Sequence, residues 1–119
     1  MTRHGKKILF TALAFMIVYP AISLLLAIFF TQPYKKSIGT PPNDWNFPIE
    51  EVAFATSDSL RLNGWYLPTE QEEKAIVLLH GYRCTRRQMI SRAGLFRENG
   101  FSVLLYDARG CGESEGERV

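Results

Sequence analysis

Residues 75–107 read AIVLLHGYRCTRRQMISRAGLFRENGFSVLLYD, and this stretch decides the fold. It opens on the apolar run Ala75–Leu79, which is typical of a strand buried on both faces. It closes on Phe101–Asp107, which predicts a second buried strand. A strand, a helix and a strand within about thirty residues form a right-handed crossover. We therefore expect two parallel strands that lie next to, or nearly next to, each other in one sheet.

The segment between the two runs carries the signals of a helix. Thr85 and Gln88 have the spacing of a capping box, and Asn99-Gly100 supplies a left-handed stop. These signals predict a helix from about Arg86 to Glu98. Its predicted packing stripe consists of Met89, Ile90, Ala93 and Phe96.

Two further strands precede this unit. Ile49–Thr56 and Leu60–Leu67 carry alternating apolar residues, and the turn-forming residues 57–59 separate them, which predicts an antiparallel hairpin. The polar residues 69–74 then connect the hairpin to the first apolar run. The expected class is therefore α/β, with a hairpin followed by a parallel β-α-β unit.

An uncharged apolar segment, Ile8–Phe30, lies near the N-terminus. A helix of this length crosses a hydrocarbon core of about 30 Å, so we interpret it as a single transmembrane anchor. A cleaved secretory signal is the alternative, because basic residues precede the segment, but a signal core is typically shorter. Pro20 is tolerated inside a membrane span.

The basic residues on either side of the anchor bear on its orientation. Arg3, Lys6 and Lys7 slightly outnumber Lys35 and Lys36, which favours a cytoplasmic N-terminus and a domain on the exoplasmic or periplasmic side. The chain then divides into a basic tail, an anchor, a proline-rich semi-extended linker and an incomplete α/β domain. Their expected bounds are 1–7, 8–30, 31–48 and 49–119.

Composition excludes several classes of function. The chain has 119 residues, a formal net charge of +2 and 22% charged residues, which does not suggest nucleic-acid binding. The arginines near the helix are interpreted as a solvated face: Arg83, Arg86, Arg87, Arg92 and Arg97. His4 and His80 are isolated and no CxxC occurs, so neither a metal site nor a cofactor is expected.

Residues 112–116, GESEG, match the G-x-S-x-G pattern of a nucleophile elbow. An elbow needs a strand running directly into the first glycine, whereas here the predicted strand ends at Asp107. The glutamates that flank Ser114 oppose formation of an alkoxide, and no histidine follows residue 80. We therefore interpret Ser114 as part of a solvated turn and not as a nucleophile.

Residues 76–89, IVLLHGYRCTRRQM, and residues 103–116, VLLYDARGCGESEG, together resemble the front of the α/β-hydrolase fold. The likeness is to membrane-anchored and exported hydrolases of the serine-aminopeptidase and lipase kind, and it covers Ile49–Val119. It implies that His80-Gly81-Tyr82 is the oxyanion loop. The backbone N–H of Tyr82 is then the candidate oxyanion donor, and Gly81 allows close approach. His80 is interpreted as a structural residue and not as the triad base.

In this family the nucleophile, acid and base come later in the chain, so the resemblance implies an N-terminal fragment without a triad. We expect the 119 residues alone to hydrolyse no ester and not to fold stably, because Ala75–Leu79 would be an unpaired apolar edge. The whole protein would hydrolyse an ester, thioester or amide bond in a small-molecule or acyl substrate. A non-catalytic anchored binding module remains the alternative, and a freely secreted enzyme is a third possibility.

The two cysteines follow the two parallel strands at the same offset. Cys84 and Cys111 each lie four residues beyond a strand end, and neighbouring strands are about 4.8 Å apart. A disulfide is therefore conceivable in an oxidising compartment. Two free thiols are the favoured alternative.

Overall fold

The structure is a computed structural model that describes residues 2–70 and 74–119, and it contains two compact units, which divide after Gln32. The first unit is helix α1, Arg3–Phe30. Its N-cap is Thr2, whose hydroxyl accepts a hydrogen bond from the Gly5 N–H at 3.3 Å. Because of this cap the helix begins at Arg3, so most of the residues that the sequence assigns to the basic tail are helical. Met1, the first residue of that tail, lies outside the described residues.

Helix α1 has 28 residues and encloses Pro20. At about 1.5 Å per residue it is roughly 42 Å long. Within residues 2–70 and 74–119, it is the helix long and apolar enough to cross a membrane. A signal sequence near an N-terminus has the same properties, so anchor and signal both remain compatible with this helix.

The second unit, Pro33–Val119, contains a four-stranded sheet in the order β2-β3-β5-β4. The hairpin β2 (Glu50–Ala55) and β3 (Arg61–Leu67) is antiparallel, and β3 pairs antiparallel with β5 (Ser102–Tyr106). Strand β4 (Ala75–Leu79) pairs parallel with β5, with Leu78 opposite Leu105. The predicted hairpin and the predicted parallel pair are both confirmed. Part of the predicted connection at residues 69–74 lies outside the described residues, because residues 71–73 are not described.

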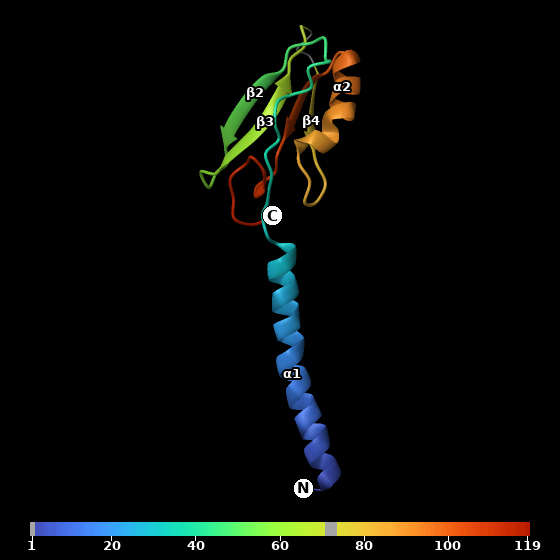
Figure 1. Ribbon diagram of the computed structural model, residues 1–119, viewed down its shortest axis with the longest axis vertical. Coiled ribbons are helices and arrows are strands. Elements are labelled where there is room, and N and C mark those ends of the chain that lie inside the picture. Colours follow the sequence, from blue (N-terminus) through green and yellow to red (C-terminus); the bar gives the residue numbers. More distant parts are fainter. Residues whose placement is uncertain (1, 71–73) are drawn as a thin grey trace. The chain divides into compact units, whose positions relative to one another are not determined.

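Helix α2 (Ile90–Glu98) packs on one face of this sheet and follows a short 3-10 helix, η1 (Arg86–Met89) (Figure 1). The helix ends as predicted, since Gly100 has φ +85° and the N–H of Asn99 returns to Leu95 O. The predicted stripe faces the sheet. The core between the two layers consists of Ile38, Trp65, Leu67, Met89, Ala93, Val103 and Leu105.

The other face of the sheet is open at β4. Val77 is 62% exposed and Leu79 is 53% exposed, whereas Leu78 packs against the core. The prediction that both faces of this strand are buried is therefore wrong for the part of the chain that the structure describes. The physical reason is that α2 covers one face only, and alternate residues of a strand point to opposite faces.

Residues 33–48 belong to the second unit, although the sequence predicts a linker there. Strand β1 (Tyr34–Lys35) pairs parallel with β6 (Cys111–Gly112). Ile38 is 3% exposed, and Trp45 and Phe47 pack against the core. The segment is irregular in its backbone, as its prolines require, but its apolar side chains cover the domain.

Candidate functional site

Two loops lie at the carboxyl edge of the parallel strands. The segment 80–85 follows β4 and the segment 107–116 follows β5. Since β4 and β5 are parallel neighbours, their carboxyl ends lie at the same edge of the sheet. Ligand sites in parallel α/β sheets form at this edge, which makes the two loops the candidate site.

A buried ion pair ties these loops together. Asp107 is fully buried, and its Oδ1 accepts the backbone N–H of Arg86 at 2.7 Å while its Oδ2 accepts a guanidinium N–H of Arg86 at 2.5 Å. Arg86 also donates to Glu113 Oε2 at 2.6 Å, and its guanidinium lies 4.6 Å from the ring centroid of Trp65. Arg86 is 3% exposed, so the interpretation of a solvated arginine is wrong at this position. The chain buries it because two carboxylates and an aromatic face compensate its desolvation.

Glu113 is the second carboxylate that pairs with the Arg86 guanidinium. Burial alone raises the pKa of Glu113, but the hydrogen bonds from Arg86 and from the Ile38 N–H, together with the guanidinium charge, outweigh it and lower the pKa below its usual value. Glu113 is therefore a carboxylate at neutral pH that fastens residues 33–48 to the loop after β5.

Ser114 has a structural role in this loop. It is 1% exposed, its Oγ donates to Asp107 O at 2.6 Å, and the same oxygen accepts the Asn63 N–H at 2.9 Å. A buried hydroxyl with both functions engaged is unavailable for attack, which agrees with the rejection of Ser114 as a nucleophile. The expected solvated turn is wrong, because the side chain points into the domain and joins the loop to β3.

The outer part of the same loop is fastened to the β2–β3 hairpin. Arg109 donates to Asp58 Oδ2 at 2.7 Å, and the Arg61 N–H donates to Glu115 Oε2 at 2.7 Å. A hydrogen bond from Thr56, followed by the bonds from Arg109, lowers the pKa of Asp58. The outer part of the loop after β5 is thus held to the hairpin at two points.

His80 bridges the two loops. Its Nε2 accepts the Ala108 N–H at 2.9 Å, so the ring proton is on Nδ1, which donates to Gly81 O at 2.8 Å. The side chain is 8% exposed. This geometry is that of the structural histidine which the sequence predicts.

The segment Gly81–Cys84 forms a β-turn, here called the Gly81 turn. The Cys84 N–H donates to Gly81 O at 3.2 Å, and Arg83 has φ +49° at the third position, where type II turns need positive φ. Tyr82 is 57% exposed. The structure thus places the predicted Gly81 and Tyr82 on an exposed turn at the carboxyl edge, beside His80.

Gln88 contacts this turn, and the predicted capping box is absent. The Thr85 side chain makes no capping hydrogen bond, and Gln88 Oε1 instead accepts the Gly81 N–H at 2.7 Å. The regular α-helix accordingly begins at Ile90, and residues 86–89 form the 3-10 helix. The Thr85–Gln88 spacing therefore predicts the correct start of the helical segment, but it predicts the wrong hydrogen-bond partner for Gln88.

The two cysteines are free thiols. Cys111 is fully buried, and burial together with the Asp107 charge raises the pKa of its thiol. The favoured prediction of two separate thiols agrees with this state.

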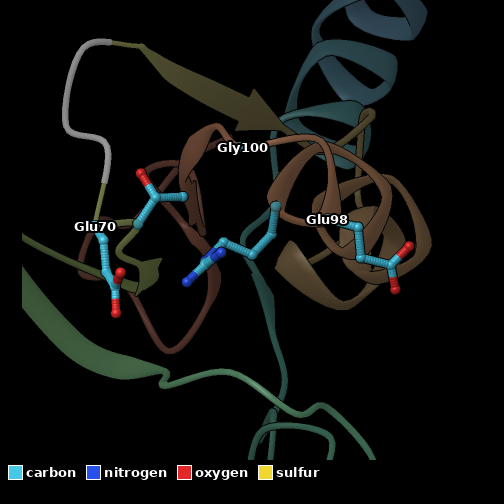
Figure 2. A pocket seen from close by; sticks show the side chains of 5 residues that line it. Glu70, Glu98 and Gly100 are labelled. Atoms are coloured by element: carbon cyan, nitrogen blue, oxygen red, sulfur yellow. The ribbon is translucent and has the colours of Figure 1, made fainter.

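A hollow lies at the opposite edge of the sheet, before β5. Figure 2 shows Glu70, which follows β3, and Glu98 and Gly100, which end α2. Its lining residues are Thr69, Glu70, Arg97, Glu98 and Gly100. It contains none of the predicted site residues.

Comparison with known proteins finds relatives that match part of this chain. No family model matches the chain. The polyketide transferase grgF of a Penicillium species is 38% identical over 71 residues, which cover 59% of this chain and 24% of grgF. The thiohydrolase aneE of Aspergillus aculeatus is 43% identical over 67 residues, which cover 56% of this chain and 21% of aneE. The chain therefore spans about a quarter of the length of these curated relatives.

Two solved structures are also similar to part of this chain. The crystal structure of GrgF, described as an α/β hydrolase, superposes with a TM-score of 0.56 and covers 59% of this chain and 25% of GrgF. The Pyrococcus furiosus esterase Pf2001 has a TM-score of 0.66 at 26% identity, and covers 75% of this chain and 34% of the esterase.

Proposed function

This chain belongs to the α/β-hydrolase superfamily, and from that premise we propose that it supplies the oxyanion loop of a membrane-anchored serine hydrolase acting on ester, thioester or amide bonds. The observation that carries the proposal is the Gly81 turn. It lies at the carboxyl edge of β4, and it is fixed by His80 on one side and exposed at Tyr82 on the other.

The proposed chemistry is stabilisation of negative charge. When a nucleophile adds to a carbonyl, the oxygen becomes an anion, and backbone N–H groups held in place stabilise it. The N–H of Tyr82 is the proposed donor from this chain, and Gly81 keeps the approach free of a side chain. The names of two relatives, a thiohydrolase and an esterase, support a thioester or an ester as the substrate class.

The nucleophile, acid and base of the proposed enzyme come from residues beyond 119. Ser114 is engaged with Asp107 and Asn63, and His80 with Ala108 and Gly81, so neither supplies the attacking group or its base. The matched segments are 24% and 21% of the relatives' lengths, which leaves room for a triad in the remainder.

A fluorophosphonate probe tests the reaction class. We expect the gene to continue into a strand followed by G-x-S-x-G, then an acid and a histidine. We expect the probe to label that serine in the full-length product and to leave residues 1–119 unlabelled. A full-length product that lacks the motif and resists the probe would favour a non-catalytic binding module.

For the location we propose that α1 is an uncleaved anchor with its N-terminus in the cytoplasm. Arg3, Lys6 and Lys7 on one side and Lys35 and Lys36 on the other support this orientation. Protease added outside spheroplasts should digest the domain. A resistant domain would reverse the orientation, and a mature product lacking residues 1–30 by intact mass would make the helix a signal.

A further inference from the structure

The side chain of Gln88 contacts the Gly81 turn, and the proposed reaction assigns no function to this contact. Its side-chain oxygen lies 2.7 Å from the Gly81 backbone nitrogen, seven residues earlier in the chain. The backbone N–H of Gln88 is already used within η1, where it donates to Thr85 O at 3.0 Å. The side chain is therefore the part of Gln88 that reaches across to the Gly81 turn.

Gly81 is held through both of its peptide groups. Its N–H goes to Gln88, and its carbonyl oxygen accepts from His80 Nδ1 at 2.8 Å and from the Cys84 N–H at 3.2 Å. A glycine has the widest choice of backbone angles of any residue. Fixing the peptide groups before and after it removes that choice.

The second of these peptide groups contains the Tyr82 N–H. A peptide group is planar and trans, so the N–H of Tyr82 lies in one plane with the Gly81 carbonyl and points the opposite way. The direction of the proposed oxyanion donor thus depends on both peptide groups of Gly81. We infer that Gln88 is a positioning residue which, by holding the Gly81 N–H, sets the direction of the Tyr82 N–H. This inference rests on the function proposed above.

The space around Gly81 supports the same role. A Cβ at Gly81 would lie 3.3 Å from Gln88 Oε1, so the two residues are matched in size as well as in hydrogen bonding. Gln88 is exposed and takes no part in the core. Its loss should therefore change the turn far more than it changes the fold.

The test compares Gln88→Ala, Gln88→Glu and a control, Ser91→Ala, at an exposed position of α2. All are made in the full-length product of the gene. Amide hydrogen exchange of residues 81–84 should become about tenfold faster in Gln88→Ala, which is the effect of losing one hydrogen bond, with β3 and β5 unchanged. Gln88→Glu keeps an acceptor oxygen and should restore slow exchange. Ser91→Ala should match the wild type.

Kinetics with a small p-nitrophenyl ester distinguish a change in the direction of the oxyanion donor, which lowers kcat, from a change in substrate binding, which raises KM. In Gln88→Ala we expect kcat to fall about 10- to 100-fold with little change in KM, because a misdirected donor weakens the transition state alone. In Gln88→Glu kcat should stay low despite restored exchange, because a carboxylate near the oxyanion opposes its charge. Wild-type exchange and wild-type kcat in Gln88→Ala would overturn the inference. A wild-type enzyme without ester turnover would instead refute the proposed reaction. If exchange is still faster in Gln88→Ala, the conclusion that Gln88 holds the Gly81 turn would stand by itself.

Discussion

Arg86 gives two hydrogen bonds to the same carboxylate, that of Asp107, one from its backbone N–H and one from its guanidinium. Asp107 is the first residue after β5, and Arg86 is the first residue of η1, which precedes α2. The pair therefore joins the sheet to the helical layer at the edge that carries the Gly81 turn.

Arg86→Met should destabilise the domain by about 3–5 kcal/mol, because it leaves Asp107 charged, buried and without its cation. The measurement is the free energy of unfolding in urea of the full-length product, because the 119 residues alone are not expected to fold stably. Arg92→Met, at an exposed position of α2, is the matched control and should change that free energy by less than about 0.5 kcal/mol. A loss below about 1 kcal/mol in Arg86→Met would mean that the Asp107 carboxylate does not depend on the Arg86 guanidinium in the folded protein.

Gly112→Ala should destabilise the domain more than Gly39→Ala. Both glycines have positive φ, +50° and +70°, so alanine costs about 1–2 kcal/mol at either position. A Cβ at Gly112 would lie 2.3 Å from Asp107 Oδ2, whereas a Cβ at Gly39 meets nothing within 4 Å. The difference between the two variants in urea unfolding isolates the clash with the carboxylate. Equal losses would place Asp107 elsewhere.

Glu113 should make stability depend on pH in the acidic range. The pKa of Glu113 is lower in the folded protein than its usual value, so the charged form is the one that folding favours. The stabilisation is fully present above the unfolded pKa and is lost as pH falls through the folded pKa. We expect the stability gap between wild type and Glu113→Gln to be constant at neutral pH and to shrink below about pH 4.5. In an Arg86→Met background this pH dependence should weaken, since two of the three causes that lower the pKa of Glu113 come from Arg86.

The sequence was sufficient to predict β4, α2 and β5 because each carries a local signal. Ala75–Leu79 and Phe101–Asp107 are unbroken apolar runs, and Asn99-Gly100 is a stop that depends on no distant contact. The parallel pairing then follows from the handedness of the crossover. The placement of Gly81 and Tyr82 in a loop after this strand came from the resemblance to the α/β-hydrolase fold and not from a local signal.

Contacts between residues that lie far apart in the sequence could not be predicted from the sequence. The bonds of Arg86 to Asp107 and Glu113 span 21 and 27 positions, and nothing local distinguishes a buried arginine from a solvated one. Ile38, Trp45 and Phe47 have neither a helical nor a strand period, so their packing on the core carries no pattern. Gln88 has the spacing of a cap, and only the fold reveals that Gly81 is its partner.

Val77→Lys should reduce association of the 119-residue chain. Val77 is 62% exposed on β4, which is the last strand of the sheet order, and an exposed apolar edge favours pairing between copies. A lysine there should lower the concentration-dependent association measured by light scattering. Ser91→Lys adds the same charge on α2 as the control. Equal suppression by both variants would attribute the effect to net charge and not to the edge.

Tyr82→Pro removes the proposed oxyanion donor without removing the turn. Tyr82 occupies the second position of the turn, where proline is favoured because its fixed φ suits that position. Losing one oxyanion donor typically costs about 100- to 1,000-fold in kcat, so we expect a loss of that size in the full-length enzyme. Tyr82→Ala keeps the N–H and removes the side chain, so its kcat should stay within about tenfold of wild type if the backbone is the donor. A large loss in Tyr82→Ala together with a small one in Tyr82→Pro would assign the function to the phenol ring, and the backbone N–H of this turn would then not be the group that holds the oxyanion.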